Sequence, residues 1–171
     1  MSVHEHKKEA PKTVRCMVLT VSDTRTKETD KSGQLIHSLL EENNHQINEY
    51  QIVKDEYSEV QRWLIHAGQR EDIDTVLING GTGVALRDTT FEAVKDSLDK
   101  ELPGFGEVFR YLSFTEDIGT AAILSRAIAG VRAERAVFSM PGSSGAVKLA
   151  MERIIIPEIA HLVREIRKDK K

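Results

Sequence analysis

A glycine-rich segment is the part of this sequence whose residue types and spacing best suit a phosphate-bearing ligand. Residues 77–88 contain Gly80, Gly81 and Gly83, with Thr82 between them. Glycine readily adopts positive φ, and consecutive backbone N–H groups can then form a nest for an anion, helped by the N-terminus of a following helix. The spacing matches neither the P-loop nor the dinucleotide-binding fingerprint. A tight turn that binds no ligand is the alternative interpretation of the same residues.

Two aspartates could supply the chemistry at this segment. Asp55 and Asp88 each end a polar loop. A phosphate-rich ligand repels carboxylates unless a divalent cation bridges them, and Mg²⁺ favours one or two carboxylates together with phosphate oxygens. The pair therefore indicates Mg²⁺–nucleotide chemistry. Asp88 could instead cap a helix and Asp55 could be a turn residue, while Arg87 could pair with a phosphate or with a surface carboxylate.

Other polar residues give less specific signals. Ser22, Asp23, Ser143 and Ser144 stand where loops enter helices, and the last two suit helix caps or phosphate contacts. No serine or cysteine lies in a nucleophile elbow, so covalent catalysis is not predicted. His4 and His6 are expected to bind metal only adventitiously. The remaining histidines lack metal-ligand spacing and are expected to be solvated or at the edge of the core: His37, His45, His66 and His161.

The composition predicts a single globular domain that positions these residues. Of the 171 residues 40% are apolar, and 24 Lys and Arg stand against 27 Asp and Glu. This near balance of charge argues against bulk binding to nucleic acid or to an acidic membrane. With no membrane span, no secretory signal and only one cysteine, Cys16, which we expect in the core, the expected location is cytoplasmic. We expect a frayed, flexible arm at 1–12, one domain at 13–167 and a polar tail at 168–171.

Apolar periodicity predicts that strands alternate with helices. The expected strands share short apolar or alternating runs: 14–21, 47–53, 75–78 and 136–140. This order predicts an α/β fold of three layers, in which a doubly wound and mainly parallel sheet carries helices on both faces. Ligands of such sheets bind beyond the carboxyl ends of the strands. The loops that leave the strands there hold most of the polar residues named above: 22–32, 54–57, 79–89 and 141–144.

Local signals mark several helix boundaries. Ser58 with Gln61, and Thr89 with Glu92, have capping-box spacing at expected helix starts. Pro157 could start or kink a final helix. Two stretches are less regular, namely 102–106, where we expect a break in the chain, and 118–133, which gives no clear pattern.

The motifs taken together resemble the MogA/MoaB family of molybdenum-cofactor biosynthesis proteins, over nearly all of residues 14–167. Each motif alone is weak, and their order and spacing carry the resemblance. They are residues 19–25 (LTVSDTR), 30–33 (DKSG), 55–56 (DE), 80–83 (GGTG) with 87–88 (RD), 103–107 (PGFGE), 124–126 (LSR) and 141–144 (PGSS). The resemblance implies a doubly wound, molybdopterin-binding domain that forms homotrimers, sometimes paired into hexamers.

Active members of that family bind molybdopterin and, with Mg²⁺ and ATP, transfer AMP to its terminal phosphate and release pyrophosphate. By this resemblance Asp55 and Asp88 are catalytic and hold Mg²⁺. The ligand phosphate is itself the nucleophile, so catalysis becomes positioning and charge neutralisation. The residues expected to bind the pterin or the nucleotide are Ser22, Asp23, Gly80, Gly81, Thr82, Gly83, Glu107, Ser125, Pro141, Gly142 and Ser143.

One departure bears on activity. MogA-type domains usually carry a second proline two residues after the Pro-Gly pair, and this chain has Ser144 there. With the short C-terminus, this resembles the MoaB branch, whose members differ in whether they adenylylate. The alternative is therefore a non-catalytic pterin-binding accessory protein of the same pathway. A nucleotide-binding oxidoreductase is disfavoured because the Gly-x-Gly-x-x-Gly fingerprint and a ribose-binding acid in its usual context are missing.

Overall fold

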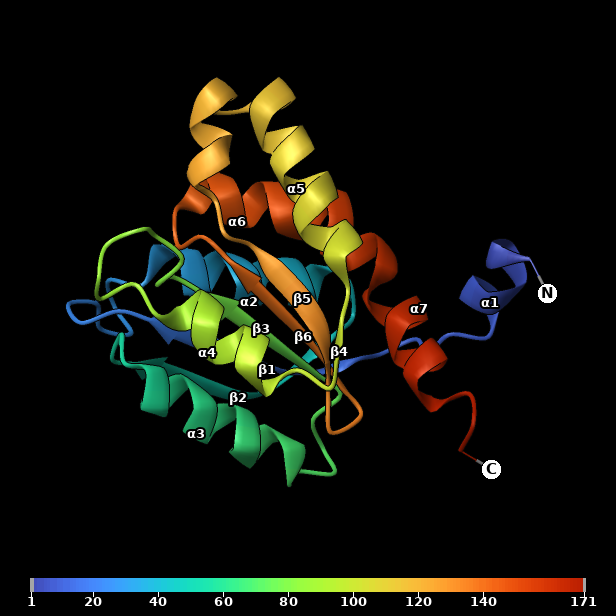
Figure 1. Cartoon of the computed structure of the whole chain (residues 1–171). Helices are drawn as coiled ribbons and strands as arrows, with labels where there is room; N and C mark the ends of the chain where they lie inside the picture. The colour runs from blue at the N-terminus through green and yellow to red at the C-terminus, as the bar shows by residue number, and fades with distance from the viewer. Residues whose placement is uncertain (1, 171) are drawn as a thin grey trace.

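The computed structural model describes residues 2–170 and is built on one six-stranded sheet (Figure 1). Its strand order is β2-β1-β3-β6-β5-β4. The strands are β1 (Arg15–Val21), β2 (Gln46–Val53), β3 (Thr75–Asn79), β4 (Lys100–Glu101), β5 (Ile128–Arg132) and β6 (Arg135–Met140). Neighbours among the first three strands and β6 pair in parallel, whereas β4 and β5 pair antiparallel. The predicted α/β fold with a mainly parallel sheet is confirmed.

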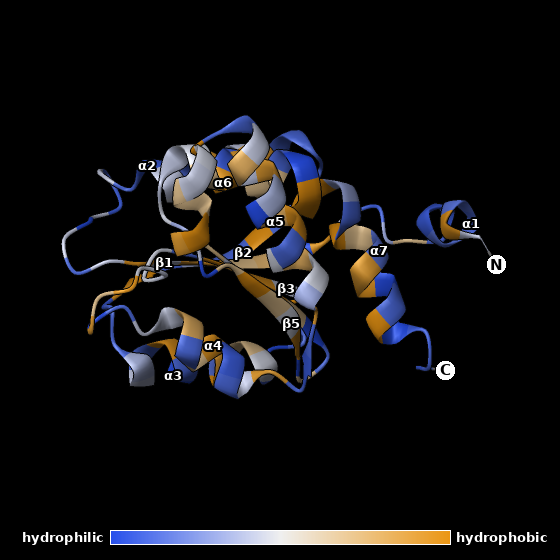
Figure 2. Cartoon of the chain, turned by 45° about the horizontal axis from the view of Figure 1, so that its top comes forward, coloured by the Kyte–Doolittle hydropathy of each residue, from blue (hydrophilic) through white to orange (hydrophobic). Residues whose placement is uncertain are grey.

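Helices cover both faces of the sheet. Along β1 the side chains alternate, so that Cys16 and Val18 join one core while Met17 and Leu19 join the other. The first core is closed by α2 (Lys31–Glu42), α5 (Pro103–Glu116), α6 (Ser144–Ala150) and α7 (Ile156–Arg167). The second is closed by α3 (Tyr57–Gly68) and α4 (Thr90–Ser97). Figure 2 shows the largely hydrophobic strands between these two helical layers, so the predicted three-layer arrangement is confirmed.

The sheet topology brings the expected loops to one edge. Val21 pairs with Val53, and Asn79 lies between Thr20 and Met140, so four parallel strands end side by side. Because β5 runs the other way, its first residue Ile128 pairs with Ser139 at this same edge. The segment before Ile128 therefore lies beside the loops after the parallel strands, which no pattern in the sequence predicts.

Several local predictions were wrong. Residues 3–8 of the expected frayed arm form a short helix, α1 (Val3–Lys8), with a capping box between Ser2 and Glu5. Neither predicted capping box forms: α3 begins at Tyr57 with Glu56 at its cap position, and Thr89 at the cap of α4 makes no side-chain hydrogen bond to the helix. The expected break at 102–106 instead becomes the start of α5, since Pro103 has no N–H to lose at a first helical position.

The unassigned region and the final helix also acquire structure. Residues 118–133 contain a 3-10 helix, η1 (Gly119–Leu124), and strand β5. A π-helical turn, η2 (Met151–Ile155), connects α6 directly to α7, and Pro157 sits in the first turn of α7. Within residues 2–170, no helix is both long and apolar enough to cross a membrane.

Candidate functional site

The glycine loop leaves β3 through two residues with left-handed backbone. Gly80 has φ +99° and Gly81 has φ +65°. A Cβ on Gly80 would lie 2.3 Å from the carbonyl oxygen of Val21, so only glycine lets the loop pass this close to the end of β1. Gly83 does not adopt positive φ. A Cβ there would lie 2.4 Å from Oδ2 of Asp88, so this glycine makes room for a carboxylate.

The loop keeps backbone donors available for a ligand. The N–H of Gly80 donates to the carbonyl of Met140 at 3.1 Å and is used by the fold. For Gly81, Thr82 and Gly83, no residue of the described chain accepts a hydrogen bond from the backbone N–H. Three successive free backbone donors in a loop of this kind suit an anion.

Arg126 ties the carbonyl side of this loop down. Its guanidinium donates to the carbonyl oxygens of Thr82, at 3.3 Å, and Asp88, at 2.8 Å. It also pairs with Glu92 and lies over the ring of Phe91, 5.2 Å from its centre. Five donors in a planar fork suit arginine to several carbonyls at once. Arg126 belongs to the Leu-Ser-Arg motif at 124–126, from which no role was predicted for this arginine.

The carboxylate of Asp55 lies against the glycine loop. A Cβ on Gly81 would be 3.0 Å from Oδ1 of Asp55, and this oxygen is buried without a hydrogen-bond partner in residues 2–170. Burial raises the pKa of Asp55 more than the backbone N–H of Thr89 lowers it, and the nearby charges of Asp88 and Asp23 raise it further. A buried acceptor left unpaired costs free energy, so this oxygen is available to a ligand.

Asp88 is held at the other end of the loop. Its Oδ2 accepts from the N–H of Ala85 at 2.9 Å, and its own N–H donates to the carbonyl of Ala85 at 3.0 Å. The helix cap position belongs to Thr89. The alternative that Asp88 caps α4 is therefore wrong. Its carboxylate remains half-buried beside Gly83.

The two carboxylates fit the donor set that Mg²⁺ prefers. Mg²⁺ is a hard cation that takes one or two carboxylates and leaves its other positions to water and phosphate oxygens. Asp55 has an unpaired buried oxygen, and Asp88 is close enough to raise its pKa. Around them, the described chain gathers no third Asp, Glu, His or Cys with ligand atoms within 4.8 Å of one another. The arrangement thus suits an ion that is shared with a phosphate rather than one fully enclosed by protein.

Asp23 and Arg87 connect the loops on either side of Asp55. The N–H of Asp55 donates to Oδ1 of Asp23 at 3.1 Å, while Arg87 pairs with Oδ2 of Asp23 at 2.9 Å. Arg87 therefore takes a surface carboxylate in this structure, and its side chain remains 67% exposed. Ser22 shapes the same loop, because its Oγ accepts from the N–H of Arg25 at 3.1 Å.

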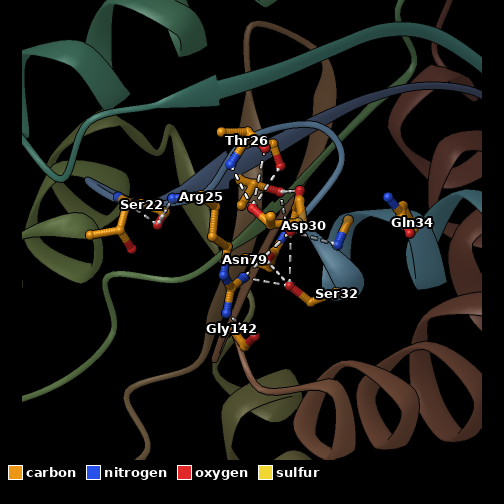
Figure 3. A network of polar contacts seen from close by, with 12 residues as sticks. Ser22, Arg25, Thr26, Asp30, Ser32, Gln34, Asn79 and Gly142 are labelled. Atoms are coloured by element: carbon orange, nitrogen blue, oxygen red, sulfur yellow. Dashed lines mark hydrogen bonds and ion pairs between the residues drawn. The ribbon is translucent and has the colours of Figure 1, made fainter.

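A buried polar network fixes the base of the 22–30 loop (Figure 3). Asp30 is fully buried and accepts hydrogen bonds from Thr20 at 2.5 Å and Tyr50 at 2.6 Å. Burial alone would raise the pKa of Asp30, but these and other donors outweigh it and lower the pKa. Ser32 links the network to Asn79 at the end of β3, through a hydrogen bond of 2.9 Å.

Arg25 joins this network to the loop after β6. It donates to Oγ of Ser32 at 2.6 Å and to the carbonyl of Gly142 at 3.0 Å. Gly142 in turn packs on Gly80, where a Cβ on Gly142 would lie 3.1 Å from the Cα of Gly80. Three loops of the site are thus tied to one another by contacts that no local sequence pattern predicts.

A cavity of about 230 Å³ opens beside the glycine loop. Apolar side chains form much of its wall, including Phe109 and Leu124. Five residues predicted to bind the ligand line it: Thr82, Gly83, Ser125, Pro141 and Ser143. The Oγ of Ser125 is buried and has no partner among the described residues, while Ser143 caps α6 by accepting from the N–H of Ala146 at 3.3 Å.

Glu107 lies apart from that cavity. It lines a second one of about 340 Å³, together with Arg110 and Arg126. Ser125 lines both cavities and is the residue that connects them. The structure therefore brings the predicted loop residues together at one edge of the sheet but places Glu107 on its flank.

One histidine prediction also fails. His45 is 9% exposed, and its Nδ1 accepts from the N–H of Val14 at 3.1 Å. It is a buried structural residue rather than a solvated one. Burial lowers its pKa, which favours the neutral form that this hydrogen bond requires.

Comparison with known proteins identifies the family of the chain. A family model described as a probable molybdopterin binding domain matches residues 17–161. Molybdenum cofactor biosynthesis protein B of Halalkalibacterium halodurans is 74% identical over 170 residues, covering 99% of this chain and all of that protein. A crystal structure of a molybdenum cofactor biosynthesis protein B superposes with a TM-score of 0.91 at 55% identity, covering 93% of this chain and 99% of the other.

A further solved structure extends the likeness to a more distant relative. The tungsten cofactor synthesizing protein MoaB from Pyrococcus furiosus superposes with a TM-score of 0.81 at 43% identity, covering 92% of this chain and 99% of that one. Fold and sequence identity thus agree over nearly the whole chain. The chain belongs to the molybdopterin-binding domain family and is a molybdenum cofactor biosynthesis protein of the MoaB type.

Proposed function

We propose that this protein binds molybdopterin and adenylylates it with Mg²⁺ and ATP, releasing pyrophosphate. The observation that carries the proposal is the unpaired buried oxygen of Asp55, which lies with Asp88 against a glycine loop that also lines the 230 Å³ cavity. A cation held by the two carboxylates would stand beside free backbone donors and beside a pocket for a second ligand. The family of the chain supports a pterin as that ligand.

The proposed role of each residue follows from its position in the site. Asp55 and Asp88 would hold Mg²⁺, which when bound neutralises the triphosphate and stabilises the charge that develops on transfer. The N–H groups of residues 81–83 would donate to phosphate oxygens. Ser125 and Ser143 face the cavity, where a pterin or its phosphate could accept or donate hydrogen bonds.

The proposed reaction needs no side-chain nucleophile. The terminal phosphate of the pterin attacks the α-phosphorus of ATP, an O–P bond forms, and the bond to the pyrophosphate leaving group breaks. The protein's contribution is then to hold both phosphates in line and to offset their charge. The one cysteine is unsuited to attack, because burial raises the pKa of the Cys16 thiol and keeps it protonated.

The test mixes purified protein with molybdopterin, Mg²⁺ and ATP, and measures pyrophosphate and adenylylated pterin. We expect Asp88→Asn to lower turnover by about a hundredfold or more while pterin binding survives. The matched control is Asp96→Asn, because Asp96 is an exposed residue of α4 that accepts a hydrogen bond from Tyr57 and lies outside the glycine loop, and this variant should turn over like wild type. Normal turnover of Asp88→Asn would refute the metal role. Pterin binding without any product from wild type would favour the non-catalytic accessory protein.

We also propose that the chain works as a homo-oligomer, a trimer or a hexamer. Large apolar side chains of α5 and η1 are exposed, among them Tyr111 at 67% and Ile123 at 82%. Exposed apolar side chains concentrated on neighbouring elements mark an association surface more often than a solvated one. Sedimentation analysis of the full chain should give three or six copies. A monomer at micromolar concentration would contradict this part of the proposal.

A further inference from the structure

A cluster of possible metal ligands joins α1 to α7, the two helices at the right of the molecule in Figure 1. His161 and Glu165 of α7 are four residues apart, so they share one face of that helix. His6 of α1 joins them, because Nδ1 of His6 is 3.0 Å from Oε1 of Glu165. One ligand atom from each of the three residues lies within 4.8 Å of the others.

Salt bridges hold α1 on α7 and so bring His6 to the cluster. Lys7 pairs with Glu158, and Arg164 pairs with Glu9 at 2.5 Å. The three candidate ligands are half-buried, with side chains 25% exposed for His6, 19% for His161 and 28% for Glu165. Two imidazoles and one carboxylate are ligands that Zn²⁺ commonly takes, whereas Mg²⁺ prefers oxygen alone.

The orientation of His161 adds an independent observation. Its Nδ1 lies 3.0 Å from Oε2 of Glu158, and its Nε2 faces Oε1 of Glu165 at 3.9 Å. A carboxylate that accepts the proton of Nδ1 leaves the lone pair on Nε2, directed toward the cluster. Metal-binding histidines are held in this way by carboxylates that do not touch the ion.

We propose that His6, His161 and Glu165 form a site for one divalent transition-metal ion such as Zn²⁺, with Glu158 positioning His161. The ion would join α1 to α7. A six-residue helix is too short to be stable alone in water, so a metal would reinforce the surface salt bridges that hold it on α7. The site is independent of the Asp55 and Asp88 carboxylates.

Competing contacts limit the expected affinity. Oε1 of Glu165 also accepts from Arg164 at 2.6 Å, and its Oε2 accepts from Lys168 at 3.2 Å. A bound ion would take Oε1 from Arg164, which keeps its pair with Glu9. The site therefore suits an ion high in the divalent affinity order, and Zn²⁺ satisfies this better than Co²⁺, which serves as the visible probe.

The test titrates metal-depleted full-length protein with Co²⁺, follows its visible absorption, and then displaces it with Zn²⁺. We expect one Co²⁺ per chain, and at least tenfold weaker binding in His6→Gln and in His161→Gln. His4→Gln is the matched control, since His4 is an exposed histidine of the same helix, and it should bind like wild type. Circular dichroism checks that each variant is folded.

Three results would overturn the site. Wild-type affinity in both His6→Gln and His161→Gln would show that these imidazoles do not bind the ion. An equal loss in His4→Gln would indicate adventitious binding by histidines near the N-terminus. Displacement of Co²⁺ by excess Mg²⁺ would place the ion at oxygen ligands instead. None of these measurements depends on adenylylation, so the site and the proposed function can fail separately.

Discussion

Replacing Gly81 with alanine should lower the free energy of unfolding by an amount that follows from the geometry of the glycine loop. Gly81 has φ +65°, and an L-residue held in the left-handed region costs about 1–2 kcal/mol. The new methyl group would also lie 2.0 Å from Oγ1 of Thr90, which is fully buried and has no room to retreat. Overpacking of this kind costs about 1–3 kcal/mol. The two effects together predict that the free energy of unfolding falls by about 2–5 kcal/mol.

Gly119→Ala separates these two effects. Gly119 has φ +60°, and a Cβ there would meet no atom within 4 Å. The free energy of unfolding of this variant should fall by about 1–2 kcal/mol, from the backbone conformation alone. Since 1 kcal/mol shifts the melting temperature by about 2–4 °C for a chain of this size, Gly81→Ala should melt roughly 2–12 °C below Gly119→Ala. Thermal unfolding followed by circular dichroism measures the difference.

The same methyl group should disturb the site. It would lie 3.0 Å from Oδ1 of Asp55, so relief of the clash moves either the loop or the carboxylate. We expect Gly81→Ala to need more Mg²⁺ for half-maximal turnover, and Gly119→Ala to need the wild-type amount. Equal melting temperatures for the two variants would refute the reasoning, because they would show that Thr90 and Asp55 do not confine the loop.

Three further predictions concern charged side chains. Arg126→Lys keeps the charge but cannot reach the carbonyls of Thr82 and Asp88 together, so the Mg²⁺ requirement in the same turnover assay should rise about tenfold. Asp74 is buried, and hydrogen bonds from Arg15 and Arg167 lower its pKa against the opposing effect of burial. Asp74 therefore stabilises the fold above its unfolded pKa, and this stabilisation is lost as pH falls through the lower folded pKa. In urea unfolding, the free energy of unfolding of Asp74→Asn should lie about 2 kcal/mol below that of wild type at pH 7, and the difference should close in acid. Asp55 has a raised pKa, so its carboxyl keeps a proton to higher pH in the folded state than in the unfolded state. Stability therefore falls as pH rises from the unfolded pKa through the folded pKa. Asp55→Asn should melt higher than wild type at pH 7 without Mg²⁺, and this difference in melting temperature should vanish below the unfolded pKa.

The fold was predictable wherever the spacing of apolar residues within a single strand or a single helix decides the structure. The buried run at 14–21 and the apolar run at 136–140 became strands of the sheet's parallel core, on either side of β3, because each has apolar residues for two covered faces. β5 was not predictable in this way. Its sequence, Ile-Ala-Gly-Val-Arg, has few large apolar side chains, and the strand exists because its backbone pairs with β6 and packs under α5.

The candidate site was predictable as a set of loops but not as a set of contacts. The rule that ligands gather beyond the carboxyl ends of parallel strands placed residues 54–57 and 79–89 together, and the register of β1 with β2 and β3 does bring them to one edge. The hold of Arg126 on the carbonyls of Thr82 and Asp88 spans 44 and 38 residues. Spacing along the chain carries no information about a partner that distant. The contact follows from the antiparallel direction of β5, which brings Arg126 to the edge where the parallel strands end.

Asp30 and Asp55 show what distinguishes a structural carboxylate from a functional one at the same sheet edge. Each stands in a motif of the loops after β1 and β2, and neither motif says which carboxylate the fold itself satisfies. Asp30 has donors on both oxygens, including Thr20, Tyr50 and the N–H of Gly33, and its pKa is lowered in spite of burial. Asp55 has a buried oxygen without a partner among residues 2–170 and a raised pKa. Because an unpaired buried oxygen costs stability that an added donor would recover, its retention is expected where a cation completes the site, and removing Asp30 should damage folding while removing Asp55 should damage only metal binding and turnover.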